Sequence, residues 1–216
     1  MTISQRAEKK EIGIISQKDM AITQFAFVGM QLLHPGKIGI FGSRVQFERF
    51  SHYWRVLGSL LGIEDRFNVC GETLDETLSR LEAIREDFIV PSLANIDSTI
   101  EDYLKIAVKG MSGFEPWLEP EAQVFMTKRL VGVNGYNFFK SEGSLDIYNQ
   151  LSWYSRFRVA TDIITYEYLS KMWAFRWCFN ILRLCFDSFN KYFPIFAIMK
   201  FGKKNAIVEV LKNKSE

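Results

Sequence analysis

The chain has 216 residues, of which 48% are hydrophobic and 15% aromatic, and its formal net charge at pH 7 is +2. This length and this hydrophobic content are typical of a folded domain with its own core, and they exclude a mostly disordered chain. Because the charge is nearly balanced, the sequence lacks the basic field typical of a nucleic-acid-binding protein. The composition favours neutral small molecules or other proteins as partners.

Apolar residues recur at helical spacing along most of the chain, and no segment has the alternation typical of a strand. Only five prolines interrupt the pattern. We therefore predict an all-α fold with one bundle-like helical domain over residues 16–200. A polar segment over residues 1–15 precedes this domain, and a basic tail over residues 201–216 follows it.

The three cysteines are predicted to be free thiols. Cys178 and Cys185 are seven residues apart on one predicted helix, so they lie about two turns from each other and cannot form a disulfide. No spacing of Cys and His typical of zinc ligands is present. The polar start of the chain lacks a signal-peptide pattern, so we expect a cytoplasmic or peripheral membrane protein.

The first predicted helix begins with a capping box at Ser16, and residues 20–33 are apolar on nearly every side. We expect this helix to be central in the domain. Its polar exceptions are Thr23, Gln24 and Gln31, and a buried amide needs a hydrogen-bond partner. Hydrogen bonds to a neighbouring helix are the interpretation that we favour, and the wall of a ligand pocket is the alternative.

The second predicted helix spans residues 44–61, and we expect it to be buried around most of its circumference. Its apolar stripe consists of Phe47, Phe50, Trp54, Leu57 and Leu61, widened by Tyr53, Val56 and Leu60. Glu48, Ser51 and Arg55 form a polar strip on the opposite side, with His52 at its margin. Such a strip pairs with neighbouring helices or faces a cavity, and internal pairing is the interpretation that we favour.

Two motifs in these helices resemble one known family. The segments SQKDMAITQFAFVG at 16–29 and HYWRVLGSLLGIEDRFNVC at 52–70 resemble the rubber oxygenases, which include latex clearing protein and the endoplasmic-reticulum-bound fungal oxygenases, and in particular their animal branch. The resemblance is strong over about the first 95 residues. Over the rest of the chain it consists only of a similar helical pattern.

The resemblance implies an oxidoreductase: an all-helical domain that holds haem b through a histidine and cleaves carbon–carbon double bonds of apolar substrates with dioxygen. It places the histidine, an arginine, a threonine and an acidic residue before the segment at 16–29. The fifteen residues that precede it here contain no histidine. We therefore expect an N-terminally incomplete member of the family, and the alternative is a non-catalytic helical binding or membrane-surface module that has lost haem.

The chain has two histidines, and neither belongs to a catalytic or metal-binding motif. His34 precedes a proline and is predicted to lie in a turn. His52 is positioned to bind haem iron or to bond Glu48, and a structural role is the interpretation that we favour. Pocket-wall candidates are Thr23, Gln24, Gln31 and Arg55.

Helices are also predicted from Thr73, with a stop or kink at Pro91, from about Ser98 to Met111, and from Pro120 to about Val131. Residues 145–193 contain no proline or glycine. This span is much longer than a typical helix, so we expect two helices with a break near residues 153–158.

The run over residues 172–204 is aromatic and apolar, and charges interrupt it too often for a membrane-spanning helix. Its polar residues form a narrow stripe: Arg176, Asn180, Arg183 and Asp187. Packing against the domain is the interpretation that we favour. The alternative is peripheral contact with a membrane surface, to which nearby lysines would add attraction for anionic lipid.

Overall fold

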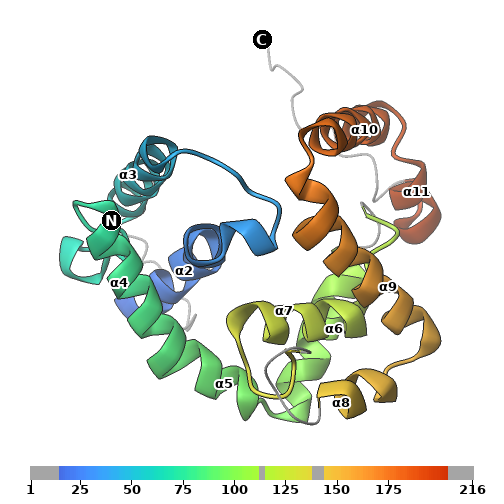
Figure 1. The fold of residues 1–216 in the computed structure, drawn as a ribbon, viewed down its shortest axis with the longest axis horizontal. Helices are drawn as coiled ribbons and strands as arrows, with labels where there is room; N and C mark the ends of the chain where they lie inside the picture. Colours follow the sequence, from blue (N-terminus) through green and yellow to red (C-terminus); the bar gives the residue numbers. More distant parts are fainter. Residues whose placement is uncertain (1–14, 112–114, 138–143, 204–216) are drawn as a thin grey trace, which may run out of the picture. The chain divides into compact units, whose positions relative to one another are not determined.

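A computed structural model describes residues 15–111, 115–137 and 144–203 of the chain (Figure 1). These residues form helices and connecting turns without a strand, so the predicted all-α fold is confirmed for the part described. Most of the predicted polar segment and most of the basic tail, residues 1–14 and 204–216, lie outside this part.

The backbone contacts divide the chain into two compact units, residues 1–92 and residues 93–216. Each unit has a core of its own and is described by itself. The single domain over residues 16–200 stays a prediction.

In the described part of the first unit the three main helices are α2 (Gln17–Leu33), α3 (Arg44–Leu60) and α4 (Leu74–Ile84). Short 3₁₀ turns follow α2 and α3 at Pro35–Lys37 and Asp65–Phe67. A serine begins each of the first two helices. Ser16 and Ser43 both form capping boxes, since each hydroxyl accepts the N–H of the third helical residue, whose side chain bonds back to the cap.

The core of the first unit lies between α2, α4 and the segment before α4. Its fully or nearly fully buried members are Phe25, Val28, Leu32, Val69, Cys70, Leu74 and Leu81. Aromatic residues of α3, including Phe47, Phe50 and Trp54, pack against this core and stay partly exposed. The expected contact between the helix beginning near Ser16 and the helix beginning near Arg44 is therefore present.

The expectation that α3 is buried around most of its circumference is wrong. Its fully buried residues are Ser51 and Gly58, whereas Tyr53, Val56 and Leu60 are exposed. The reason is that part of the polar side of α3 faces α4, where the Ser51 hydroxyl lies 2.9 Å from that of Thr77. A hydrogen-bonded pair of hydroxyls can be buried. The polar side chains of α3 therefore did not show which side of the helix faces solvent.

The end of α4 widens into a π-helical turn at Arg85–Ile89, and α5 (Val90–Ala94) continues it. Within this turn the Val90 N–H donates to the carbonyl five residues earlier, on Arg85. Pro91 has no N–H to donate to the preceding turn, and a wider turn accommodates a proline without ending the helix. The predicted stop or kink at Pro91 therefore corresponds to a change in helix type just before the proline. The chain stays helical through Pro91 itself.

The second unit contains α6 (Ser98–Met111), α7 (Pro120–Val131), α8 (Ser144–Gln150), α9 (Trp153–Ile163), α10 (Trp173–Tyr192) and α11 (Ile195–Phe201). Its core is centred on Ala122 and Phe125 of α7 and Val159 of α9. Two rings pack edge-on against Phe125, with centroids at 5.2 Å for Tyr136 and 6.0 Å for Tyr148. These contacts hold α7, α9 and the end of α8 together.

The long span without proline or glycine has two interruptions. The first, at residues 151–152, immediately precedes the predicted range, and there the Ser152 hydroxyl caps α9 by accepting the Ser155 N–H. The second was not predicted: α9 widens into a π-helical turn at Ile164–Tyr168, followed by a 3₁₀ turn at Leu169–Lys171.

Trp54 offers a test of the packing of α3. Its ring stacks on that of Phe27 at 5.4 Å and packs against the core, so Trp54→Ala is expected to lower the free energy of unfolding by about 3 kcal/mol. The neighbouring Tyr53 is 60% exposed, and Tyr53→Ala is expected to cost less than about 1 kcal/mol. Denaturant titration measures both values. Equal losses in the two variants would contradict this account of the packing.

Candidate functional site

The side chain of Gln24 connects α2 to α3 and to the segment at residues 68–69. Its amide nitrogen donates to the Trp54 carbonyl at 2.9 Å and to the Asn68 side chain at 3.0 Å. Its amide oxygen accepts the Val69 N–H at 3.2 Å. Gln24 thus makes the helix-to-helix hydrogen bonds that we favoured, and its amide is fully engaged within the protein.

Gly58 allows this network to form. A β-carbon at that position would lie 2.6 Å from the amide nitrogen of Gln24 and 3.0 Å from that of Asn68. Any other residue would therefore force both amides to move. The motif residues at the end of α3 thus include a glycine because two buried amides pass directly over the helix backbone.

The other pocket-wall candidates have different surroundings among the described residues. Thr23 is exposed, and its hydroxyl donates to the Asp19 carbonyl of its own helix. Gln31 is half-buried, and its Oε1 has no hydrogen-bond partner among the residues described. Arg55 lies near two carboxylates, with N···O distances of 3.4 Å to Asp65 and 3.5 Å to Glu72.

His52 is exposed and lines an open groove of about 620 Å³ between α3 and the start of α4. The groove wall is charged: Arg44 pairs with Asp75 at 2.6 Å and with Glu48 at 3.0 Å. Haem b needs an apolar slot for its ring, and these surroundings do not fit it. His34 caps the end of α2, where burial and the nearby charges of Lys37 and Arg85 lower its pKa.

A second cavity, of about 400 Å³, lies in the second unit. Three elements line it with the loop before α7: the end of α9, the π-helical turn and α10. Its lining residues are Trp117, Arg158, Thr161, Asp162, Thr165, Tyr166, Phe179, Leu182, Arg183 and Phe186. Its volume is within the range of small-molecule pockets, and it combines aromatic walls with a few polar groups, as such pockets do.

Ring contacts hold the aromatic wall of this cavity. Trp117 packs on Phe186 with ring centroids 4.4 Å apart, and Tyr166 meets Phe179 edge-on at 6.4 Å. A bidentate ion pair between Glu167 and Arg129 connects the π-helical turn to α7. Two neighbouring residues of the turn therefore have different roles. Glu167 connects the turn to α7, and Tyr166 lines the cavity.

Two polar groups of the cavity have pKa values that burial shifts: Asp162, which is buried, and Tyr166, which is 37% exposed. Burial raises the pKa of the Asp162 carboxyl above its ordinary value, and Arg158, bonded to it at 3.0 Å, partly offsets this rise. Burial also raises the pKa of Tyr166, and the charge of Asp162 adds to the effect. The Tyr166 hydroxyl therefore stays protonated at neutral pH and can donate a hydrogen bond, while Asp162 can accept one.

We did not predict this cavity from the sequence. Asp162 and Tyr166 are four residues apart in a span that was expected to be regular helix, and Trp117 comes from a distant loop. The one available signal was an acidic residue within a largely apolar helix. Because buried carboxylates usually have partners, such a residue indicates either an ion pair or a site.

The described residues contain no group of three or more His, Cys, Asp or Glu side chains positioned to hold a metal ion. None of the helices described is long and apolar enough to cross a membrane. Comparisons with family models, curated proteins and solved structures give no match to this chain.

The Gln24 network predicts a large loss of stability when the amide is removed. Gln24→Leu leaves the Val69 N–H buried without its partner and removes the bonds to the Asn68 side chain and the Trp54 carbonyl, which is expected to cost about 3 kcal/mol. Thr23→Val, one residue earlier on the exposed side, is expected to change stability by less than about 0.5 kcal/mol. Urea titration compares the two. A Gln24→Leu protein as stable as the parent would contradict the assigned network.

Proposed function

We propose that this chain is an oxygenase-type helical protein that takes an apolar small molecule, and that the cavity of the second unit binds this molecule. The observation that carries the proposal is the combination of an aromatic wall with Asp162 and Tyr166 at a π-helical turn. π-Helical turns occur frequently at functional sites, because they change the direction of side chains within a helix.

The cavity favours a ligand that carries a hydroxyl group. A hydroxyl group can donate a hydrogen bond to Asp162 and can accept one from the Tyr166 hydroxyl, and both residues line the cavity. Trp117, Phe179 and Phe186 offer the remainder of the molecule an aromatic surface. The proposed ligand class is therefore an apolar alcohol.

The oxidoreductase part of the proposal rests on the resemblance of the segments at 16–29 and 52–70 to rubber oxygenases. In that class haem supplies the reaction with dioxygen. The surroundings of His52 do not fit haem, so we assign no catalytic step to the residues of the first unit. Their role in the proposal is structural, since Gln24 and Asn68 fix the two motif segments to each other.

A second candidate is a non-catalytic binding module related to the oxygenases. The observation that favours this candidate is the position of His52. Its side chain is exposed and lines a groove with charged residues. In this case the cavity of the second unit would bind its ligand without converting it. The two candidates share the ligand site and differ in whether the bound molecule is converted.

Matched ligands with and without a hydroxyl test the cavity. Naphthylmethanol is expected to bind more tightly than methylnaphthalene, and Tyr166→Phe is expected to weaken naphthylmethanol about tenfold because one hydrogen bond is lost. Methylnaphthalene affinity should not change. Equilibrium dialysis gives the dissociation constants.

The control is Tyr168→Phe, which removes a hydroxyl two residues along the same π-helical turn. Tyr168 does not line the cavity and is exposed. Its substitution should leave both ligands unaffected. Binding of naphthylmethanol that is insensitive to Tyr166→Phe would refute the assigned site.

Reconstitution with hemin tests whether His52 is a haem ligand. We expect the chain to show no sharp Soret band of histidine-ligated haem, and the spectrum should not change in His52→Ala. The measurement is an absorption spectrum after removal of unbound hemin. A Soret band that His52→Ala abolishes would make His52 an axial ligand and would favour the oxygenase candidate.

A further inference from the structure

Helix α10 packs against its own unit with one side only. Phe179 and Phe186 point to the inner side, where they meet the rings of Tyr166 and Trp117. Arg183, at the edge of this side, bonds Glu115. These contacts account for the inner side of the helix and leave the opposite side without ring partners from the unit's core.

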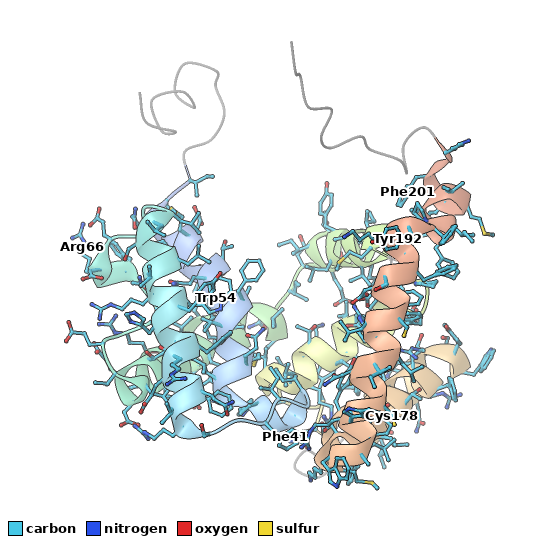
Figure 2. All side chains as sticks on the ribbon, turned by 90° about the horizontal axis from the view of Figure 1, so that it is seen from above. Phe41, Trp54, Arg66, Cys178, Tyr192 and Phe201 are labelled. Atoms are coloured by element: carbon cyan, nitrogen blue, oxygen red, sulfur yellow. The ribbon has the colours of Figure 1, made fainter. Side chains whose placement is uncertain are left out.

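The opposite side of α10 is apolar and exposed. Trp173, Trp177, Ile181 and Leu184 follow one another at four-, four- and three-residue steps, so they lie along one face. Trp173 is 75% exposed, Trp177 63% and Leu184 66%. Cys178 and Cys185 of α10 are also exposed, and Cys185 lines the same groove as Leu184. In Figure 2, α10 extends from the region of Cys178 to Tyr192 with its side chains drawn.

The apolar surface continues from the end of α10 to α11. An open groove of about 440 Å³ lies at the end of α10, and its lining contains no charged residue: Leu184, Cys185, Ser188, Phe189, Tyr192 and Phe193. On α11, Met199 is 79% exposed and Phe201 is also exposed. We call the exposed side of α10, this groove and α11 the aromatic face.

Positive charge surrounds the aromatic face. Residues 171–203 contain six basic residues and one acidic residue. That acidic residue, Asp187, is paired with Arg183 at 3.4 Å. The exposed lysines stand at the two ends of the segment, with Lys171 before α10 and Lys191, Lys200 and Lys203 at or after its end. An apolar face with basic ends is complementary to a surface that is apolar inside and negative outside.

We propose that the aromatic face lies in the surface of a membrane that contains anionic lipids. Indole and phenol rings favour the headgroup level of a bilayer, and the face has Trp173 and Trp177 near one end and Tyr192 near the other. Lysines at both ends contact the headgroups, while Ile181 and Leu184 reach the acyl chains. The chain then lies on the membrane through α10 and α11.

A second copy of the chain fits this face less well than a membrane. In a two-fold contact the same surface meets itself, so the lysines of one copy would face those of the other. The face offers no unpaired acidic residue to neutralise them. Anionic lipid supplies that neutralisation, and the membrane is therefore the occupant to which we commit.

Vesicle sedimentation tests the proposal with the full chain. The protein should bind vesicles of phosphatidylcholine with 30% phosphatidylserine more tightly than vesicles of phosphatidylcholine alone. Trp177→Glu should reduce this binding at least about tenfold, because it places a charge in the apolar face. Trp153→Glu is the matched control: Trp153 is 74% exposed on α9, outside the face, and its substitution should leave binding unchanged.

The lysines give a second, independent readout. Lys191→Gln and Lys203→Gln should each weaken binding to the anionic vesicles about fivefold and leave binding to neutral vesicles unchanged. Equal binding of both vesicle types, or equal losses in Trp177→Glu and Trp153→Glu, would overturn the proposal.

The cysteines report directly on the aromatic face. Cys178 and Cys185 should react with maleimide in solution and become protected when anionic vesicles are added, whereas buried Cys70, whose pKa burial raises to about 11, should stay unreactive throughout. Protection of both thiols in a vesicle-free monomer would mean that the chain itself covers the face. Protection in a dimer that Trp177→Glu dissociates would mean that a second copy does. Either result would overturn membrane binding.

Discussion

The side-chain amide of Gln24 bonds to three polar groups in two segments of the first unit: the Trp54 carbonyl on α3, and the Asn68 side chain and Val69 N–H of the segment before α4. A buried amide that makes all of these bonds fixes the position of α2 relative to α3 and to the chain that follows it, because each bond would be costly to leave unmade. Gly58 belongs to the same constraint, since the amides of Gln24 and Asn68 occupy the space of its missing side chain.

In the second unit the corresponding constraint is a change of helical register. The π-helical turn at Ile164–Tyr168 inserts a wider turn after α9, with the Leu169 N–H bonded to the carbonyl of Ile164. This turn directs Glu167 to Arg129 and leaves Tyr166 beside Asp162 in the cavity. A regular helix would place these side chains at other angles, so the polar end of the cavity depends on the π turn.

Helix α10 connects the two proposals. Phe179 and Phe186 on its inner side line the cavity, and Trp177 and Leu184 on its outer side form part of the aromatic face. An apolar alcohol partitions into membranes, so a ligand of this class and a membrane-surface helix suit each other chemically. The charged stripe at the edge of the helix separates the sides, with Arg183 bonded to Glu115 within the unit.

The sequence by itself determined the fold class and most of the helix ends. Ser16, Thr73 and Pro120 start helices where predicted, and Gly62 follows α3 with a positive φ of 92°. These features could be predicted because caps, glycines and periodicity act within a few residues.

Only the tertiary structure decided which sides of the helices are buried and where a site lies. Ser51 became buried because Thr77 supplies a partner 26 residues away, while Tyr53 became exposed on an apolar stripe. The cavity likewise joins Trp117 to Phe186 through a contact that no local pattern specifies. Burial and site geometry depend on partners distant in sequence, and helical spacing contains no information about those partners.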